Sequence, residues 1–139
     1  MRDDIKALIR QRRHCVLATA ADNQPYCSLM AYTASADCTR ILMATFRNTR
    51  KFRNLCDNPW VSLLIDSRET EPGQALTVEG AFQEITDEAE KRQIRQRLME
   101  DHPGMKDFLD QPETAIISIQ IHALVFLNGL TDVHRERLI

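Results

Sequence analysis

Three predicted strands follow one another between residues 14 and 45, and their connections are too short to hold a helix. Residues 14–20, 26–32 and 40–45 are apolar-rich runs of strand length, separated by clusters of Asp, Asn, Pro and Ser. Parallel neighbours need a crossover of about a dozen residues or more, whereas antiparallel neighbours can follow a tight turn. The sequence therefore predicts an antiparallel meander, and a doubly wound parallel sheet is the poorer fit.

The rest of the chain is predicted to add three strands and three helices. We expect strands over 60–66, 75–85 and 115–127, and helices over 3–12, from Asn48 or Thr49 to Asn58, and from Thr86–Asp87 to 101. Gly80 in mid-strand is typical of a bulge or bend, and a break near His122 would divide the last strand in two. Glu90 is placed to complete a capping box at the third helix. A polar loop is expected over 67–74, and residues 131–139 show no clear period.

Six or seven strands with short connections favour a mainly β fold, an antiparallel β-barrel with flanking helices. Closure of the sheet removes the exposed edges that an open sheet of this size would present. The 139 residues contain no repeat, low-complexity segment or Pro/Gly/Ser-rich linker. We therefore expect a single domain over residues 1–139.

The junction at residues 45–51 gathers hydroxyl groups and cations where a strand ends and a helix begins. Its sequence is Thr-Phe-Arg-Asn-Thr-Arg-Lys. The first N–H groups of a helix are unpaired and the helix dipole is positive there, so Arg50 and Lys51 carry the unfavourable charge unless an anion binds. We predict an anion site here, with phosphate as the best-fitting anion. In the alternative interpretation, Arg47, Arg50, Lys51 and Arg53 form a solvated basic face.

Composition and motifs argue against several other classes of protein. The net charge of −2 gives no overall attraction to nucleic acid or to an anionic membrane. The apolar stretch at 115–127 is too short and polar to span a bilayer, and the acidic N-terminus lacks the apolar core of a secretory signal, so we expect a cytoplasmic protein. The cysteines and histidines lack metal-site spacing. The sequence shows no nicotinamide fingerprint, Walker loop or catalytic triad pattern.

Three segments of the sequence resemble the pyridoxamine 5'-phosphate oxidase-like family of flavin-binding split barrels. They read QPYCSLMAY, ILMATFRNTRKFRNLCDNPWVSLLI and ALTVEGAFQEITDEAEKRQIRQRLMEDHP. The resemblance covers about His14 to Arg137. It is closest where the family carries a threonine, a Ser/Thr-Arg-Lys cluster and an Asn-Pro, which here are Thr45, Thr49-Arg50-Lys51 and Asn58-Pro59.

The resemblance implies a six-stranded split barrel that forms a homodimer and binds FMN at the subunit interface. The implied cofactor-binding residues are Ser28, Leu29, Met30, Thr45, Arg47, Thr49, Arg50, Lys51 and Gln74. In the family, the strand that holds the first three offers backbone groups to the flavin ring, the cluster from Thr45 to Lys51 holds the phosphate, and a glutamine near Gln74 lies at the flavin edge. Trp60, Phe82 and the apolar last strand supply surface for the interface.

Two departures from the family pattern bear on the reaction. The true oxidases carry a substrate-binding Arg-x-His near the C-terminus, where this chain has Asp132 and His134, and a tryptophan against the cofactor, where it has Leu127. The resemblance therefore implies an FMN-dependent oxidoreductase that acts on an unidentified small molecule other than pyridoxamine phosphate. The alternatives are a flavin carrier or electron-transfer module, and a split barrel that binds a deazaflavin or haem. A nucleic-acid-binding or protein-binding barrel is disfavoured by the negative net charge.

Overall fold

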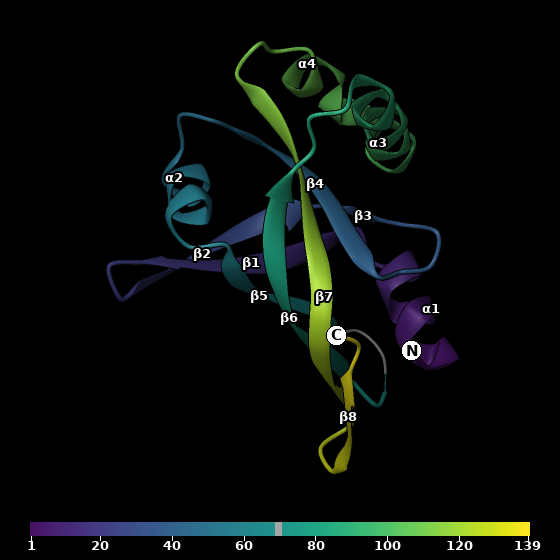
Figure 1. The fold of residues 1–139 in the computed structure, drawn as a ribbon. Coiled ribbons are helices and arrows are strands. Elements are labelled where there is room, and N and C mark those ends of the chain that lie inside the picture. The colour runs from purple at the N-terminus through teal and green to yellow at the C-terminus, as the bar shows by residue number, and fades with distance from the viewer. Residues whose placement is uncertain (69–70) are drawn as a thin grey trace.

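The computed structural model describes residues 1–68 and 71–139, and its strands form one antiparallel sheet (Figure 1). The strand order is β2-β1-β5-β6-β7-β4-β3, and β8 pairs with β7 outside this path. The predicted mainly β antiparallel fold is confirmed, and part of the loop expected over 67–74 lies outside the described residues. The strands are β1 His14–Ala21, β2 Gln24–Ala31, β3 Thr33–Ala34, β4 Arg40–Phe46, β5 Trp60–Ser67, β6 Gln74–Glu84, β7 Thr114–Asn128 and β8 Asp132–Arg137.

The sheet curls because the strands at its two ends are consecutive in the chain. β2 lies at one end and β3 at the other, and only Tyr32 separates them. The Tyr32 backbone N–H donates to the Arg13 carbonyl oxygen at 3.1 Å, and its hydroxyl donates to the Ile9 carbonyl oxygen at 2.6 Å. The result is a curled half-barrel in which β2 pairs with β1 on one side only.

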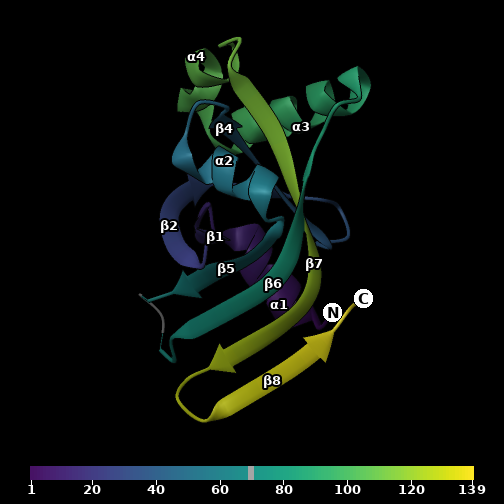
Figure 2. The same ribbon diagram turned by 60° about the vertical axis from the view of Figure 1, so that its left-hand side comes forward.

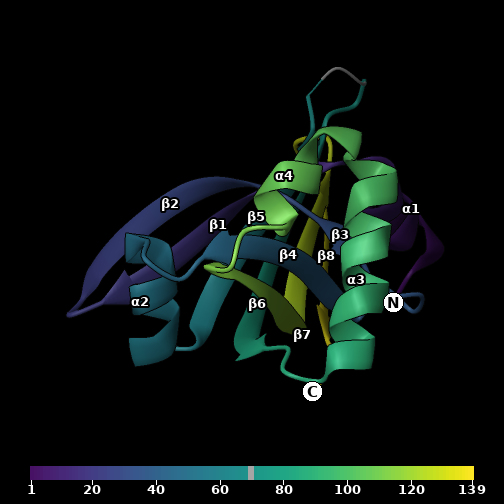
Figure 3. The same ribbon diagram turned by 90° about the horizontal axis from the view of Figure 1, so that it is seen from above.

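Helices flank this half-barrel. Figures 1 and 3 show α1 and α2 at opposite sides of the sheet. α1 buries Ile5, Leu8 and Ile9 in the main core, and Ile94 and Leu98 of α3 join a second apolar cluster. Within the described part of the chain, no helix has the length and apolar character needed to cross a membrane. The helices are α1 Asp3–Gln11, α2 Arg50–Asp57, α3 Glu88–Asp101, the 3-10 helix η1 Pro103–Met105 and α4 Lys106–Leu109.

A bulge bends the two longest strands, β6 and β7. Glu79 pairs with Ala123 but the next residue, Gly80, pairs with Ile121, so His122 is the extra residue on β7. The predicted irregularity at Gly80 is confirmed. β7 continues through His122 as one strand instead of dividing there.

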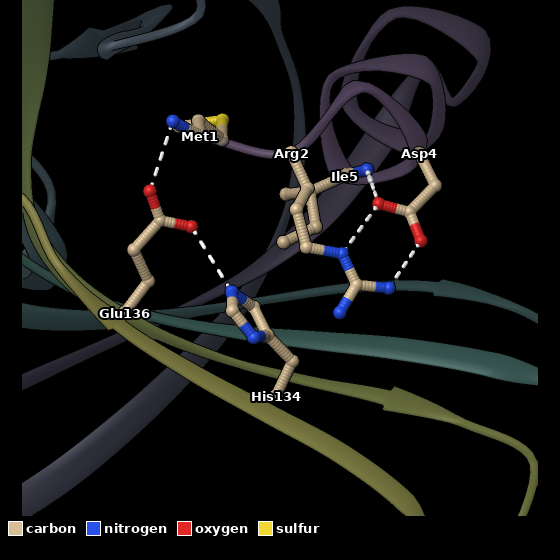
Figure 4. A network of polar contacts seen from close by, with 6 residues as sticks. All are labelled: Met1, Arg2, Asp4, Ile5, His134 and Glu136. Carbon is tan, nitrogen blue, oxygen red and sulfur yellow. Dashed lines mark hydrogen bonds and ion pairs between the residues drawn. The ribbon is translucent and has the colours of Figure 1, made fainter.

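The C-terminal residues form a strand, which the sequence pattern over 131–139 did not reveal. β8 runs back along the second half of β7, as Figure 2 shows. Its Glu136 carboxylate lies 2.9 Å from the Met1 ammonium group and 3.2 Å from His134 Nε2 (Figure 4). The hydrogen bond from the ammonium group lowers the pKa of Glu136. Both ends of the chain are therefore attached to the same edge of the sheet.

One other expectation needs correction. Asp87 caps α3 by accepting a hydrogen bond from the Glu90 N–H at 2.9 Å, but the Glu90 carboxylate pairs with Arg40 instead of completing the capping box. Phe82 is partly buried and packs against the core and against Phe52, with ring centroids 6.1 Å apart. Helices η1 and α4, which the sequence analysis missed, lie between α3 and β7.

Candidate functional site

A cavity of about 360 Å³ lies between β2, β4 and the N-terminus of α2, and is termed the edge cavity. Its volume falls within the range of roughly 300–1,000 Å³ that is usual for small-molecule sites. The edge cavity brings together five residues predicted from the sequence, which are Leu29, Met30, Thr45, Thr49 and Lys51. Ala31, Ala44, Phe46, Gly104, Met105 and Phe108 complete its lining.

The β2 wall of the edge cavity has backbone N–H and C=O groups that are not used in the sheet, because β2 pairs only with β1. The hydrogen bond from the Tyr32 N–H to the Arg13 carbonyl oxygen sets the phase of the β1–β2 ladder. Alternate residues form the hydrogen-bonded pairs in such a ladder, so Met30 faces β1 and Leu29 points its N–H and C=O away. The Leu29 side chain is also 74% exposed. A planar ligand beside Leu29 would therefore meet a fixed donor and acceptor.

Two threonine hydroxyl groups stand at the start of α2. Thr49 caps the helix, because its Oγ1 accepts from the Phe52 N–H at 3.3 Å and donates to the Phe46 carbonyl oxygen at 2.9 Å. The Oγ1 of buried Thr45 lies 3.5 Å from that of Thr49. The first turn of α2 contains no acidic residue. No carboxylate in the first turn of α2 therefore neutralises the positive end of the helix dipole.

The cations of α2 have different surroundings. Lys51 lines the edge cavity and forms no ion pair with a described carboxylate. Arg50 is exposed, and its guanidinium carbon lies 4.5 Å from the centre of the Tyr26 ring on β2. Arg53 is exposed one turn further along the helix and does not line the cavity. Lys51 is thus the cation placed to face a ligand in the cavity, with Arg50 next to it in the chain.

Ser28, Arg47 and Gln74 also lie outside the cavity lining. Arg47 Nη2 pairs with Glu84 Oε2 at 2.5 Å and its Nη1 donates to the Thr114 carbonyl oxygen, so Arg47 fastens the β4–α2 loop to β6 and β7. Ser28 pairs with β1 in the ladder, next to Leu29. Gln74 begins β6, whose other end is at Glu84, and the strand rise of about 3.4 Å per residue places these ends on the order of 30 Å apart. Within one chain, Gln74 does not reach the edge cavity.

One side of the edge cavity comes from η1 and α4. The Phe108 ring packs on the Phe46 ring with centroids 4.5 Å apart, while Gly104 and Met105 lie beside them. The sequence does hold a signal for this wall. Met105, Phe108 and Leu109 have the spacing of one apolar helical turn directly after the Pro-Gly that ends α3.

The side chains of the edge cavity favour an organic ligand over a metal ion. Of the described residues that line it, none is His, Cys, Tyr, Asp or Glu, and the only sulfur atoms are the thioethers of Met30 and Met105. Nowhere in residues 1–68 and 71–139 do three or more His, Cys, Asp or Glu side chains form a group that could hold a metal ion. All four cysteines are free, and burial raises the pKa of the Cys15 thiol to about 12.

Comparison with known proteins shows the family to which the chain belongs. The sequence profile of the pyridoxamine 5'-phosphate oxidase family matches residues 1–128. The chain belongs to this family. The matched region runs from α1 to β7 and includes every residue that lines the edge cavity. No curated protein matches the sequence.

Solved structures share the fold of this family member at low sequence identity. A putative pyridoxamine 5'-phosphate oxidase from Listeria innocua is 21% identical with a TM-score of 0.76, over 91% of this chain and 98% of that one. A FAD-binding protein from Mesorhizobium loti is 19% identical (TM-score 0.74; 88% and 91%). HutZ, the haem storage protein of Vibrio cholerae, is 22% identical (TM-score 0.75; 87% and 90%). These structures show the split-barrel fold, so the choice of cofactor must be argued from this chain's own residues.

Proposed function

We propose that this protein is an FMN-binding flavoprotein whose edge cavity and α2 N-terminus hold the cofactor. The observation that carries the proposal is the convergence of Thr45, Thr49 and Lys51 with the free edge of β2 on one cavity. A phosphate group at the start of α2 would accept charge-assisted hydrogen bonds from Lys51 and Arg50, and hydrogen bonds from the first N–H groups of the helix. The flavin ring would lie against the backbone of Leu29.

Haem is a poorer fit to the same cavity. Proteins hold haem iron through His, Cys, Tyr or Met side chains. Only Met30 and Met105 offer such a group among the described residues of the lining, and Met30 is 5% exposed. The compact Thr-Arg-Lys cluster suits a phosphate monoester, which FMN carries and haem lacks.

We propose that the protein is a flavin-dependent oxidoreductase acting on a small molecule. A bound flavin supplies hydride or electron transfer, and the protein supplies position and electrostatics. Lys51 would anchor the phosphate, Leu29 would orient the ring, and the packed rings of Phe46 and Phe108 would keep water from one side. A flavin carrier would use the same residues without a substrate, and steady turnover of an electron acceptor separates the two roles.

The visible spectrum of the purified protein tests the proposed cofactor. After incubation with FMN and removal of free ligand, we expect flavin absorption bands that dithionite or a nicotinamide donor bleaches. Incubation with haemin is the parallel arm. A Soret band from stoichiometric haem, together with no retention of FMN, would refute the flavoprotein proposal.

Oxidation of pyridoxamine phosphate is expected to be negligible. The Arg-x-His of the true oxidases is replaced by Asp132 and His134, and His134 Nε2 contacts the Glu136 carboxylate at 3.2 Å. A carboxylate at position 132 would repel the substrate phosphate that an arginine attracts. Formation of the aldehyde, followed with saturating FMN, measures this. Turnover at the rate of a dedicated oxidase would contradict this expectation and would show that the protein is a pyridoxamine phosphate oxidase.

We further propose that the protein forms a homodimer through the outer face of β1, β5 and β6. Trp60 on this face is 58% exposed and packs edge-on against His122, with ring centroids 5.1 Å apart. Glu79 and Arg137 line the same hollow, and neither forms an ion pair within the described chain. In a two-fold symmetric interface, Glu79 of each copy could pair with Arg137 of the other.

Trp60→Asp is expected to shift the dimer toward monomer by at least about 30-fold in dissociation constant, since buried tryptophans at interface centres typically contribute 2 kcal/mol or more. Light scattering across a concentration series measures the shift. Leu130→Asp is the matched control, because Leu130 is 95% exposed at the β7–β8 turn, away from this face. A parent protein that is monomeric at micromolar concentration with flavin bound would contradict the dimer proposal.

A further inference from the structure

Arg50 and Tyr26 form a contact between α2 and the edge strand that the phosphate site alone does not explain. Arg50 is the first residue of α2, and Tyr26 lies on β2, three residues before Leu29. The Arg50 guanidinium carbon lies 4.5 Å from the Tyr26 ring centre, within the range of a cation–π contact. An exposed arginine is thus tied to the same strand that faces the proposed flavin ring.

A buried polar relay holds the two elements in this arrangement. The Asn54 side chain of α2 donates to Thr19 Oγ1 of β1 at 3.1 Å, and Thr19 Oγ1 lies 3.5 Å from the Tyr26 carbonyl oxygen on β2. Asn54 and Thr19 are both buried, at 7% and 2% exposure. Polar groups at such burial need their partners, so the relay fixes α2 against β1 and β2. The relay therefore holds α2 and the Tyr26 backbone at the separation at which the Arg50 guanidinium lies over the Tyr26 ring.

We propose that Tyr26 is a positioning residue that presents the Arg50 guanidinium to the phosphate of the flavin, so that the site selects phosphorylated flavin over riboflavin. This inference rests on the proposed function. A free arginine side chain loses rotamer freedom when it binds an anion, whereas one already held on an aromatic face loses less. A guanidinium that stacks its flat face on an aromatic ring keeps its N–H edge available to a phosphate.

The test compares Tyr26→Leu with Tyr26→Phe by titrating each apoprotein with FMN and with riboflavin. Tyr26→Leu removes the aromatic face and is expected to weaken FMN binding by about 2- to 10-fold, because arginine must then be ordered on binding. Riboflavin has no phosphate, so its affinity is expected to stay unchanged. Tyr26→Phe keeps the ring and should restore the selectivity of the parent. Circular dichroism checks that both variants fold.

The double variant separates positioning from direct contact. If Tyr26 acts through Arg50, then adding Tyr26→Leu to Arg50→Ala should cause no further loss of FMN affinity. Equal weakening of FMN and riboflavin by Tyr26→Leu would overturn the inference, as would tighter FMN binding or a loss that persists without Arg50. A parent that binds neither flavin would refute the proposed function, and this inference with it. If the parent binds FMN and Tyr26→Leu binds it equally tightly, the inference is refuted and the proposed function stands.

Discussion

Replacing Lys51 by alanine is expected to weaken FMN binding by about 10- to 150-fold. Lys51 lines the edge cavity in the first turn of α2 and has no ion-pair partner in the described chain. A hydrogen bond to a charged group contributes about 1.5–3 kcal/mol, which corresponds to this change in affinity. Arg50→Ala is expected to fall in the same range. Flavin fluorescence during titration of the apoprotein measures both.

Arg53→Ala is the matched control for these two variants. Arg53 carries the same charge on the same helix, but it lies beyond the N-terminal residues Arg50 and Lys51 and away from the positive end of the helix, so its loss should leave FMN affinity unchanged. Riboflavin affinity should also be unchanged in Lys51→Ala. If Lys51→Ala and Arg50→Ala both bind FMN as tightly as the parent, the phosphate assignment is wrong, and the basic residues of α2 are only a solvated face.

The parts of the fold that could be predicted from the sequence depend on local chemistry. The β1–β2 hairpin turns at Asp22 and Asn23, which adopt φ angles of 51° and 62°, and short polar residues of this type tolerate that conformation. Thr49 caps α2 because its hydroxyl reaches an N–H three residues later. β8 is different. Its burial alternates only between exposed and half-buried, so its place in the sheet depends on pairing with β7 and has no strong signal of its own.

The candidate site also contains residues that could be predicted from local sequence and residues that could not. Thr49, Arg50 and Lys51 are adjacent in the sequence, so the anion half of the site could be recognised from one segment. Arg47 belongs to the same basic cluster, but its partner Glu84 lies 37 residues away in the chain. The sequence shows that a side chain is charged and does not show what neutralises it. The wall formed by Phe108 could not be placed either, because it depends on how α4 folds back onto β4.

Gly80→Ala is expected to lower the free energy of unfolding by about 1–3 kcal/mol, the usual cost of overpacking a core site. The added Cβ would lie 2.5 Å from the Gln120 carbonyl oxygen and 2.7 Å from Ile119 Cγ2. The carbonyl oxygen belongs to the backbone of β7, which pairs with β4 and β6, so it cannot move without disturbing both ladders. The midpoint and slope of a urea transition measure the loss.

Gly104→Ala is the matched control for stability, because a Cβ at Gly104 would meet nothing within 4 Å. Its free energy of unfolding should stay within about 0.5 kcal/mol of the parent value. Since both variants add the same methyl group, the difference between them isolates the close approach of β6 and β7 at the bulge. Equal stability of Gly80→Ala and the parent would mean that the strands can separate there at little cost. In that case the β6 position opposite the bulge at His122 would not require glycine.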